Sequence, residues 1–132
     1  MEHTALIYVM VLMSAADSNM TDRELFTIGE IVRTLPIFRD YDAELLPKAA
    51  EDCAEMLGQD GGLDAVLQSI YEGLPEHLRE TAYALACDVA AVEGKLKQAE
   101  IQLLDFLRHK LGLDRLTAAA IERGARARYS TL

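Results

Sequence analysis

Apolar side chains recur along this chain at intervals of three and four residues, the spacing that places them on one face of an α-helix. A clear example is the stripe formed by Leu25, Ile28, Ile31, Val32 and Leu35. No segment shows the strict alternation of apolar and polar residues that is typical of a half-buried strand. Glycine and proline residues interrupt the stripes, as they do where helices end. The pattern therefore predicts an all-α protein.

The positions of these interruptions predict seven helices. The expected ranges are 3–17, 21–35, 42–58, 62–73, 76–93, 97–111 and 114–129. Pro47 lies inside the third range, and proline is tolerated in the first turn of a helix but not in its interior, so this helix is expected to begin near Leu46. No linker or low-complexity tract divides the chain. Residues 1–132 are therefore expected to form one domain, a single bundle of about seven helices.

The first predicted helix is apolar around its whole circumference. The residues from Ala5 to Met13 are all apolar, but Glu2 and His3, which precede them, do not supply the basic segment of a secretory signal. The run is also much shorter than the roughly 20 apolar residues that span a bilayer. We therefore expect a helix buried in the core of a cytoplasmic protein, with no insertion into a membrane.

A short acidic turn occurs twice in the chain. Asp17 and Glu24 bound the first copy, and Glu93 and Glu100 bound the second, 76 residues later. In each copy an acidic residue ends an apolar run, a polar turn follows, and a glutamate opens the next apolar stripe. The stripes after the two turns match at the same offset. This predicts two pseudo-repeated helix–turn–helix units, one near each end of the chain, with a helical pair between them.

The charge, the cysteines and the absence of catalytic motifs limit the classes of function that the chain can have. The chain has 22 acidic and 13 basic residues and a net charge of −9, which disfavours binding to nucleic acid and favours cations or basic protein surfaces. Cys53 and Cys87 lack a metal-binding or redox spacing and are expected to be buried, reduced thiols. No recognised catalytic motif is present, so we expect a protein that is not an enzyme. The basic residues of the last predicted helix form either a solvated face or a docking surface for an acidic partner.

The second acidic turn resembles a known family. Residues 86–96 read Ala-Cys-Asp-Val-Ala-Ala-Val-Glu-Gly-Lys-Leu, and Glu100 and the sequence Leu111-Gly112-Leu113 follow. An alanine-rich helix, an Asp-Gly turn, a hydrophobe and a later glutamate are typical of the tellurite-resistance TerB family, and the chain is similar to it over essentially its whole length. Here Glu93 stands where that family usually has its second Asp, and Ser18 stands where it usually has its first Gly.

The resemblance implies a compact seven-helix fold with an acidic cluster that binds divalent cations. It also implies a role in resistance to tellurite and other chemical stress. The partners it implies are proteins, including membrane-associated resistance proteins.

Five carboxylates are candidate metal ligands. If the two units pack around a pseudo-two-fold axis, Asp17, Glu24, Glu93 and Glu100 would converge, with Asp88 nearby. Hard oxygen donors of this kind suit Ca²⁺, Mg²⁺ or Mn²⁺. Carboxylates that are crowded together repel one another and raise one another's pKa, which gives a physical reason to bind a cation.

For three of these carboxylates the neighbouring residues suggest a structural role in place of metal binding. Glu24 completes a capping box with Thr21, and this role needs no metal. Lys97 holds the equivalent position before Glu100 and is a poor N-cap, so capping explains Glu100 less well. Asp88 lies in an otherwise apolar helix, where an arginine or a helix amide can pair with it. The alternative function is therefore a protein-interaction scaffold whose acidic turns are purely structural.

Overall fold

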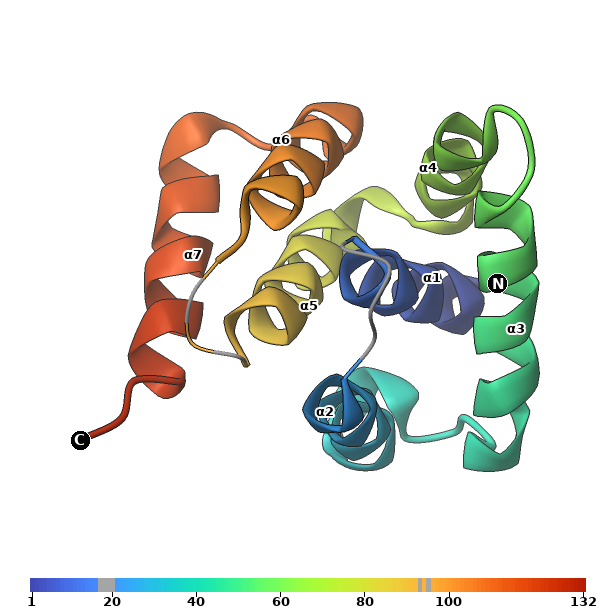
Figure 1. Ribbon diagram of the computed structural model, residues 1–132, viewed down its shortest axis with the longest axis horizontal. Coiled ribbons are helices and arrows are strands. Elements are labelled where there is room, and N and C mark those ends of the chain that lie inside the picture. The colour runs from blue at the N-terminus through green and yellow to red at the C-terminus, as the bar shows by residue number, and fades with distance from the viewer. Residues whose placement is uncertain (17–20, 93, 95) are drawn as a thin grey trace.

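The fold is a single all-α bundle (Figure 1), and the computed structural model describes residues 1–16, 21–92, 94 and 96–132. Within these residues there are seven α-helices, three short 3₁₀ helices and no strand. The α-helices are α1 (Glu2–Ser14), α2 (Asp22–Thr34), α3 (Leu46–Leu57), α4 (Gly62–Gly73), α5 (Arg79–Ala91), α6 (Gln98–Leu111) and α7 (Arg115–Arg128). The 3₁₀ helices are Pro36–Phe38, Ala43–Leu45 and Glu76–Leu78. The predicted all-α class and the seven helices are confirmed.

Local sequence signals account for most of the helix ends. Helix α3 begins at Leu46, so Pro47 occupies its first turn as expected. Helix α6 ends at Leu111 and is followed by Gly112, whose positive φ of 70° suits glycine. Helix α7 begins after Asp114, whose carboxylate accepts a hydrogen bond from the Thr117 amide. The predicted range 76–93 was too long at its start, because its first turn is a 3₁₀ helix that precedes Arg79.

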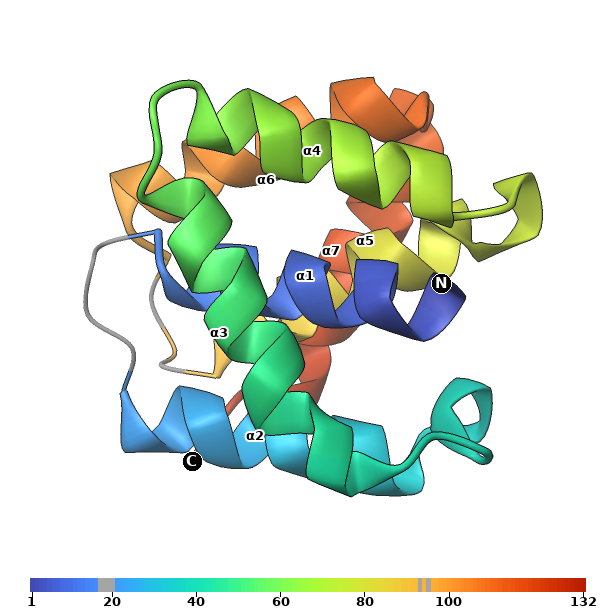
Figure 2. The same ribbon diagram turned by 90° about the vertical axis from the view of Figure 1, so that its right-hand side faces the viewer.

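Helix α1 forms the centre of the bundle. It packs against α3, α4 and α5, and Figure 2 shows these helices around it. All residues from Ala5 to Ser14 are buried, which confirms the expected buried helix. A helix that is apolar on every side is stable in water only when other elements cover it on every side. No helix among the described residues is both long enough and apolar enough to cross a membrane.

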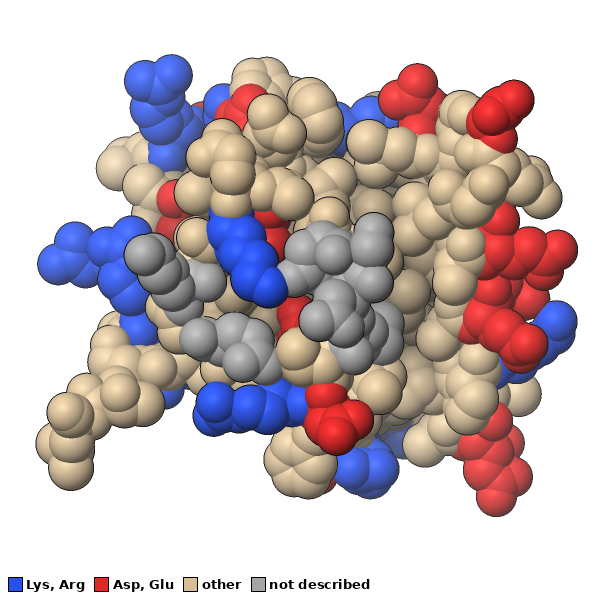
Figure 3. Space-filling view, viewed as in Figure 1, with Lys and Arg blue, Asp and Glu red and all other residues tan. Residues whose placement is uncertain are grey.

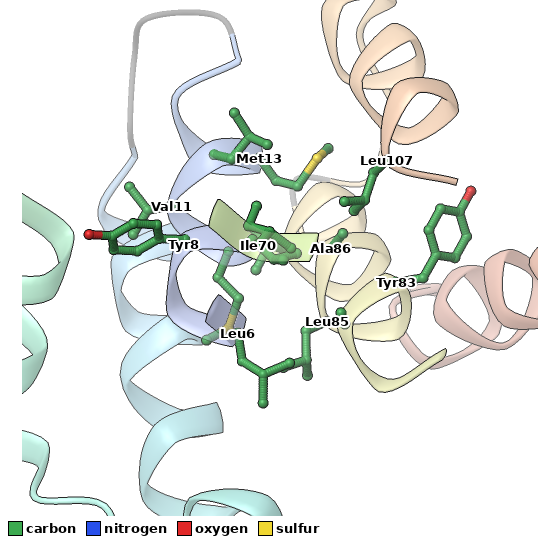
Figure 4. Packing of buried hydrophobic residues seen from close by; sticks show 14 of the residues in the cluster. Leu6, Tyr8, Val11, Met13, Ile70, Tyr83, Leu85, Ala86 and Leu107 are labelled. Atoms are coloured by element: carbon green, nitrogen blue, oxygen red, sulfur yellow. The ribbon is translucent and has the colours of Figure 1, made fainter. Parts of the chain in front are cut away.

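Helix α5 lies beside α1 and connects the centre of the bundle to its C-terminal edge. Leu85 and Ala86 lie near the apolar cluster of α1, whereas Tyr83 points away from it (Figure 4). On its other side α5 packs against α7. Helix α5 is therefore covered on two sides, by α1 and by α7.

Charged side chains are distributed unevenly over the surface. In Figure 3 acidic side chains gather mostly at the right, over α3, and basic side chains at the left, over α7. Helix α3 contributes exposed Glu51 and Glu55 to the acidic side. The exposed arginines of α7 are Arg115, Arg123, Arg126 and Arg128. The arginines of the last helix are thus solvent-exposed, and whether they also bind an acidic partner stays a prediction.

Candidate functional site

The helix ends that flank the two acidic turns lie on one side of the molecule. Helices α1 and α5 end, and helices α2 and α6 begin, towards the left of Figure 2. Asp22 at the start of α2 and Val92 just after α5 line the same surface cleft. Asp17 and Glu93, two of the predicted ligands, lie outside the described residues. The described flanks of the two turns therefore face the same region.

Glu24 completes the capping box that its sequence predicts. Its Oε1 atom accepts hydrogen bonds from the amide of Thr21 at 2.9 Å and from the Thr21 hydroxyl at 3.2 Å. In return, Thr21 Oγ1 accepts a hydrogen bond from the amide of Glu24 at 3.1 Å. Only 4% of Glu24 is exposed. The carboxylate is thus held at the start of α2, where the positive end of the helix dipole favours a negative charge.

Glu100 has the matching position at the start of α6. Its Oε1 atom accepts a hydrogen bond from the amide of Lys97 at 2.9 Å, and 6% of the residue is exposed. A lysine ammonium has no lone pair with which to accept the reciprocal bond from the Glu100 amide. Glu100 nevertheless acts as a cap, contrary to the weaker role that the poor N-cap suggested. The backward reach of a glutamate needs only a backbone N–H at the N-cap position, which lysine supplies as well as threonine.

Asp88 pairs with an arginine. The guanidinium of Arg128, on α7, donates a hydrogen bond to Asp88 Oδ1 on α5, and this contact raises the pKa of Arg128. Asp88 is half-buried, whereas Arg128 is exposed. The arginine alternative for Asp88 is therefore realised. The partner could not be identified from the sequence because it lies 40 residues away.

The described carboxylates have the donor chemistry that a cation needs, but they do not form a complete binding site. Among the residues that the structure describes, no group of three or more His, Cys, Asp or Glu side chains is arranged to hold a metal ion. Glu24 and Glu100 are suitable in chemistry, since each is a buried hard-oxygen donor with one oxygen oriented by a backbone amide. Two carboxylates alone do not provide the roughly six to eight oxygens that surround Ca²⁺. Further oxygens would have to come from Asp17, Glu93, the backbone or water.

One polar group close to the first turn is unsatisfied. Ser14, the last residue of α1, is fully buried, and its hydroxyl has no hydrogen-bond partner among the described residues. A buried hydroxyl in this state costs about 1–3 kcal/mol. Sequence reasoning missed it, because a serine at the end of an apolar run does not reveal whether its hydroxyl reaches a partner. The group lies three residues before Asp17.

A cavity of about 540 Å³ between α5, α6 and α7 was also missed. Most of its lining is apolar, and Tyr83 and Cys87 from α5 contribute to it. Cys53 and Cys87 are both buried free thiols, as expected, and burial raises the pKa of each to about 12. The alanines of α7 are a signal in the sequence that could have suggested a space, because small side chains leave room next to a neighbouring helix.

Comparison with known proteins places the chain in a family. The family model described as tellurite resistance protein TerB matches residues 3–125, nearly the whole chain. A search of curated proteins found no match, and a search of solved structures found none either.

Proposed function

The chain belongs to the TerB family of tellurite resistance proteins, and on this basis we propose that it is a non-catalytic module that binds a divalent cation at its two acidic turns. The proposed donors are Asp17, Glu24, Glu93 and Glu100. The supporting observation is the matched pair of buried glutamates at the starts of α2 and α6, each with one oxygen oriented by an N-cap amide. Asp88 is left out of the donor set because its carboxylate already pairs with Arg128.

Charge supplies the reason for binding. The chain carries a net charge of −9, and the two glutamates are both largely withdrawn from water. A cation such as Ca²⁺, Mg²⁺ or Mn²⁺ would neutralise the carboxylates that bind it, and would tie the starts of the two helices together. We propose that this loaded face then docks onto protein partners, including membrane-associated resistance proteins, during the stress response.

Calorimetric titration of the full chain with each of the three cations at physiological salt tests the proposal. Glu24→Gln and Glu100→Gln are suitable variants, because glutamine can still cap the helix but carries no charge. Glu51→Gln, at an exposed position of α3, is the matched control. We expect heat of binding and a rise in Tm for the wild type and the control, and a loss of both in the double variant. Absence of heat and of any Tm change at millimolar cation would overturn the proposal.

A second candidate is a protein-interaction scaffold whose acidic turns are structural. It is favoured by a specific observation: Glu24, Glu100 and Asp88 each have a protein partner. Under this candidate Glu100→Gln changes stability only modestly, and partners stay bound in the presence of a chelator. Co-purification from native cells, with and without chelator, separates the two functions. Partner recovery that is lost on chelation supports the cation-dependent module.

A further inference from the structure

The cavity between α5, α6 and α7 arises from the way in which the last two helices diverge. The tight connection at Gly112 joins α6 to α7 at the top of Figure 1, and α7 then runs down the left edge of the molecule. Within the described chain, α5 is the principal partner of both helices. The space between α6 and α7 is therefore open at the surface and floored by α5.

Small residues keep this space from being filled. The floor includes Cys87 and Ala91 from α5, and Ala125 lines the α7 side. Around them lie larger apolar residues, of which Leu96, Ile101 and Phe106 are exposed. The volume of about 540 Å³ lies within the range of roughly 300–1,000 Å³ that is usual for small-molecule sites. A space of this size with an apolar lining suits a compact apolar ligand.

The charges around the cavity decide which kind of ligand it favours. The Tyr83 hydroxyl donates a hydrogen bond to Glu122 at 2.5 Å. Arg108 lies 3.6 Å from the Asp105 carboxylate and also donates to the Leu113 carbonyl.

These contacts leave Arg126 as the one charged lining side chain, among the described residues, that makes no hydrogen bond or ion pair with another side chain. Arg126 is exposed on α7, lines the cavity and has no ion-pair partner among the described residues. The four charged lining residues, Asp105, Arg108, Glu122 and Arg126, sum to zero, so the preference for an anion comes from Arg126 as the one whose charged group has no side-chain partner within the described chain, and not from an excess of positive charge. A cationic ligand would meet Arg126, whereas the two nearby carboxylates are already engaged.

We propose that this cavity binds a small apolar molecule that carries a single anionic group, with the apolar part between α6 and α7 and the anion at Arg126. A guanidinium is well suited to this role because it offers several fixed N–H donors to a carboxylate. Glu24 and Glu100 do not line the cavity. Gly94 and Ile101, which do line it, are next in the chain to the proposed cation donors Glu93 and Glu100, so the two sites are neighbours that share no proposed donor, and the titration is made with and without chelator.

Titration of the full chain with decanoate below its micellar concentration, followed by amide NMR shifts, tests the site. Decanol and decyltrimethylammonium serve as probes with the same chain and a different head group. We expect shifts confined to α5, α6, α7 and the residues next to them, and decanoate binding at least about tenfold tighter than the ammonium probe. Shifts centred elsewhere, or equal affinity for the three probes, would overturn the proposal.

Matched substitutions locate the two parts of the ligand. Arg126→Gln should weaken decanoate binding about threefold to tenfold and leave decanol unaffected, whereas Arg123→Gln, exposed on the same helix but away from the cavity, should change neither. Equal behaviour of these two variants contradicts the role of Arg126.

A second pair of substitutions tests where the apolar part of the ligand binds. Ile101→Gln should weaken all three probes, and Leu25→Gln, at the equivalent position of α2, should weaken none. Ile101 is 46% exposed and Leu25 is 51% exposed, so neither substitution threatens the fold. If the ligand-free protein shows concentration-dependent shifts at the cavity, a second copy occupies it, and the small-molecule proposal is wrong.

Discussion

Helices α1 and α7 both pack extensively against α5, one on each side of it (Figure 1), but they use different kinds of side chain. Helix α1 has 13 residues, of which ten consecutive ones are buried, and most of these are large and apolar. Helix α7 has 14 residues, and only Ala118 and Ala125 are buried. Two polar contacts, Tyr83 with Glu122 and Asp88 with Arg128, supplement the packing of α7.

The difference shows that similar extents of helix contact do not imply similar contributions to stability. Burial of a large apolar side chain contributes roughly 1.5–3 kcal/mol, whereas an alanine buries little area. Polar contacts at a surface add less, because water competes for the same groups. We therefore expect α1 to carry much of the free energy of folding, and α7 to be attached more weakly next to the cavity that it covers.

The largest expected effect comes from the centre of α1. Met10→Ala removes a fully buried side chain, so it should lower the free energy of unfolding by about 2–5 kcal/mol in urea denaturation. The matched substitution on α7 is Leu116→Ala, at a residue that is 82% exposed, and it should change stability by less than about 0.5 kcal/mol. Similar losses for the two variants would remove the distinction between the helices.

A smaller effect is expected at the contact between Tyr83 and Glu122. Tyr83 is buried, and Glu122→Ala deprives its hydroxyl of an acceptor, which should cost about 1–3 kcal/mol. We expect the lower end of this range, because the hydroxyl lines a cavity that water can enter. Glu122→Gln keeps an acceptor oxygen and should cost less. Equal costs for the two substitutions, measured by thermal unfolding, would show that the hydrogen bond is not what holds α7.

The ion pair between Asp88 and Arg128 should contribute less again. Arg128 is exposed, so we expect a coupling energy of only about 0.2–1 kcal/mol from a double-mutant cycle with Arg128→Ala and Asp88→Ala. The coupling should decrease as salt is raised, because ions screen an exposed pair. A coupling that is large and independent of salt would mean that α7 is anchored electrostatically.

The smallest effect is expected at the start of α7. The amide of Thr117 donates a hydrogen bond to Asp114 and lowers the pKa of that carboxyl below its ordinary value of 3.8. A lowered pKa in the folded state means that the stabilisation is present above the unfolded pKa and is lost as the pH falls through the folded pKa. Asp114→Asn should therefore leave stability at pH 7 nearly unchanged, because asparagine is also a good N-cap.

The same variant should flatten the acid limb of the stability curve, measured as Tm against pH between pH 5 and 2. This range begins above the ordinary pKa of 3.8 and extends below it, in the direction in which folding moves the pKa of Asp114. An acid limb identical to that of the wild type would show that Asp114 does not contribute to it.

Features that depend on neighbours in the chain could be predicted from the sequence. The spacing of apolar residues located the seven helices, and Pro47 located the start of α3. The continuous apolar run identified α1 as buried, and Thr21 with Glu24 identified a capping box. These predictions succeeded because helical periodicity, proline geometry and capping operate over about one to four residues.

The candidate site was only partly predictable. Glu24 behaves as its sequence indicated. Glu100 caps α6 although Lys97 is a poor N-cap, because the donor is the backbone amide of Lys97 and not its side chain. The 76-residue repeat and the convergence of the two turns stay predictions. They concern the relative placement of segments that include Asp17 and Glu93, which lie outside the described residues.

The sequence by itself determined the helices, the burial of α1 and the capping at the start of α2. Only the tertiary structure decided that Asp88 meets Arg128, that Tyr83 meets Glu122 and that a cavity separates α6 from α7. These partners lie 39 or 40 residues apart in the chain. Their contact depends on the angles and distances at which whole helices pack, which are set jointly by many side chains and not by the spacing of any one pair.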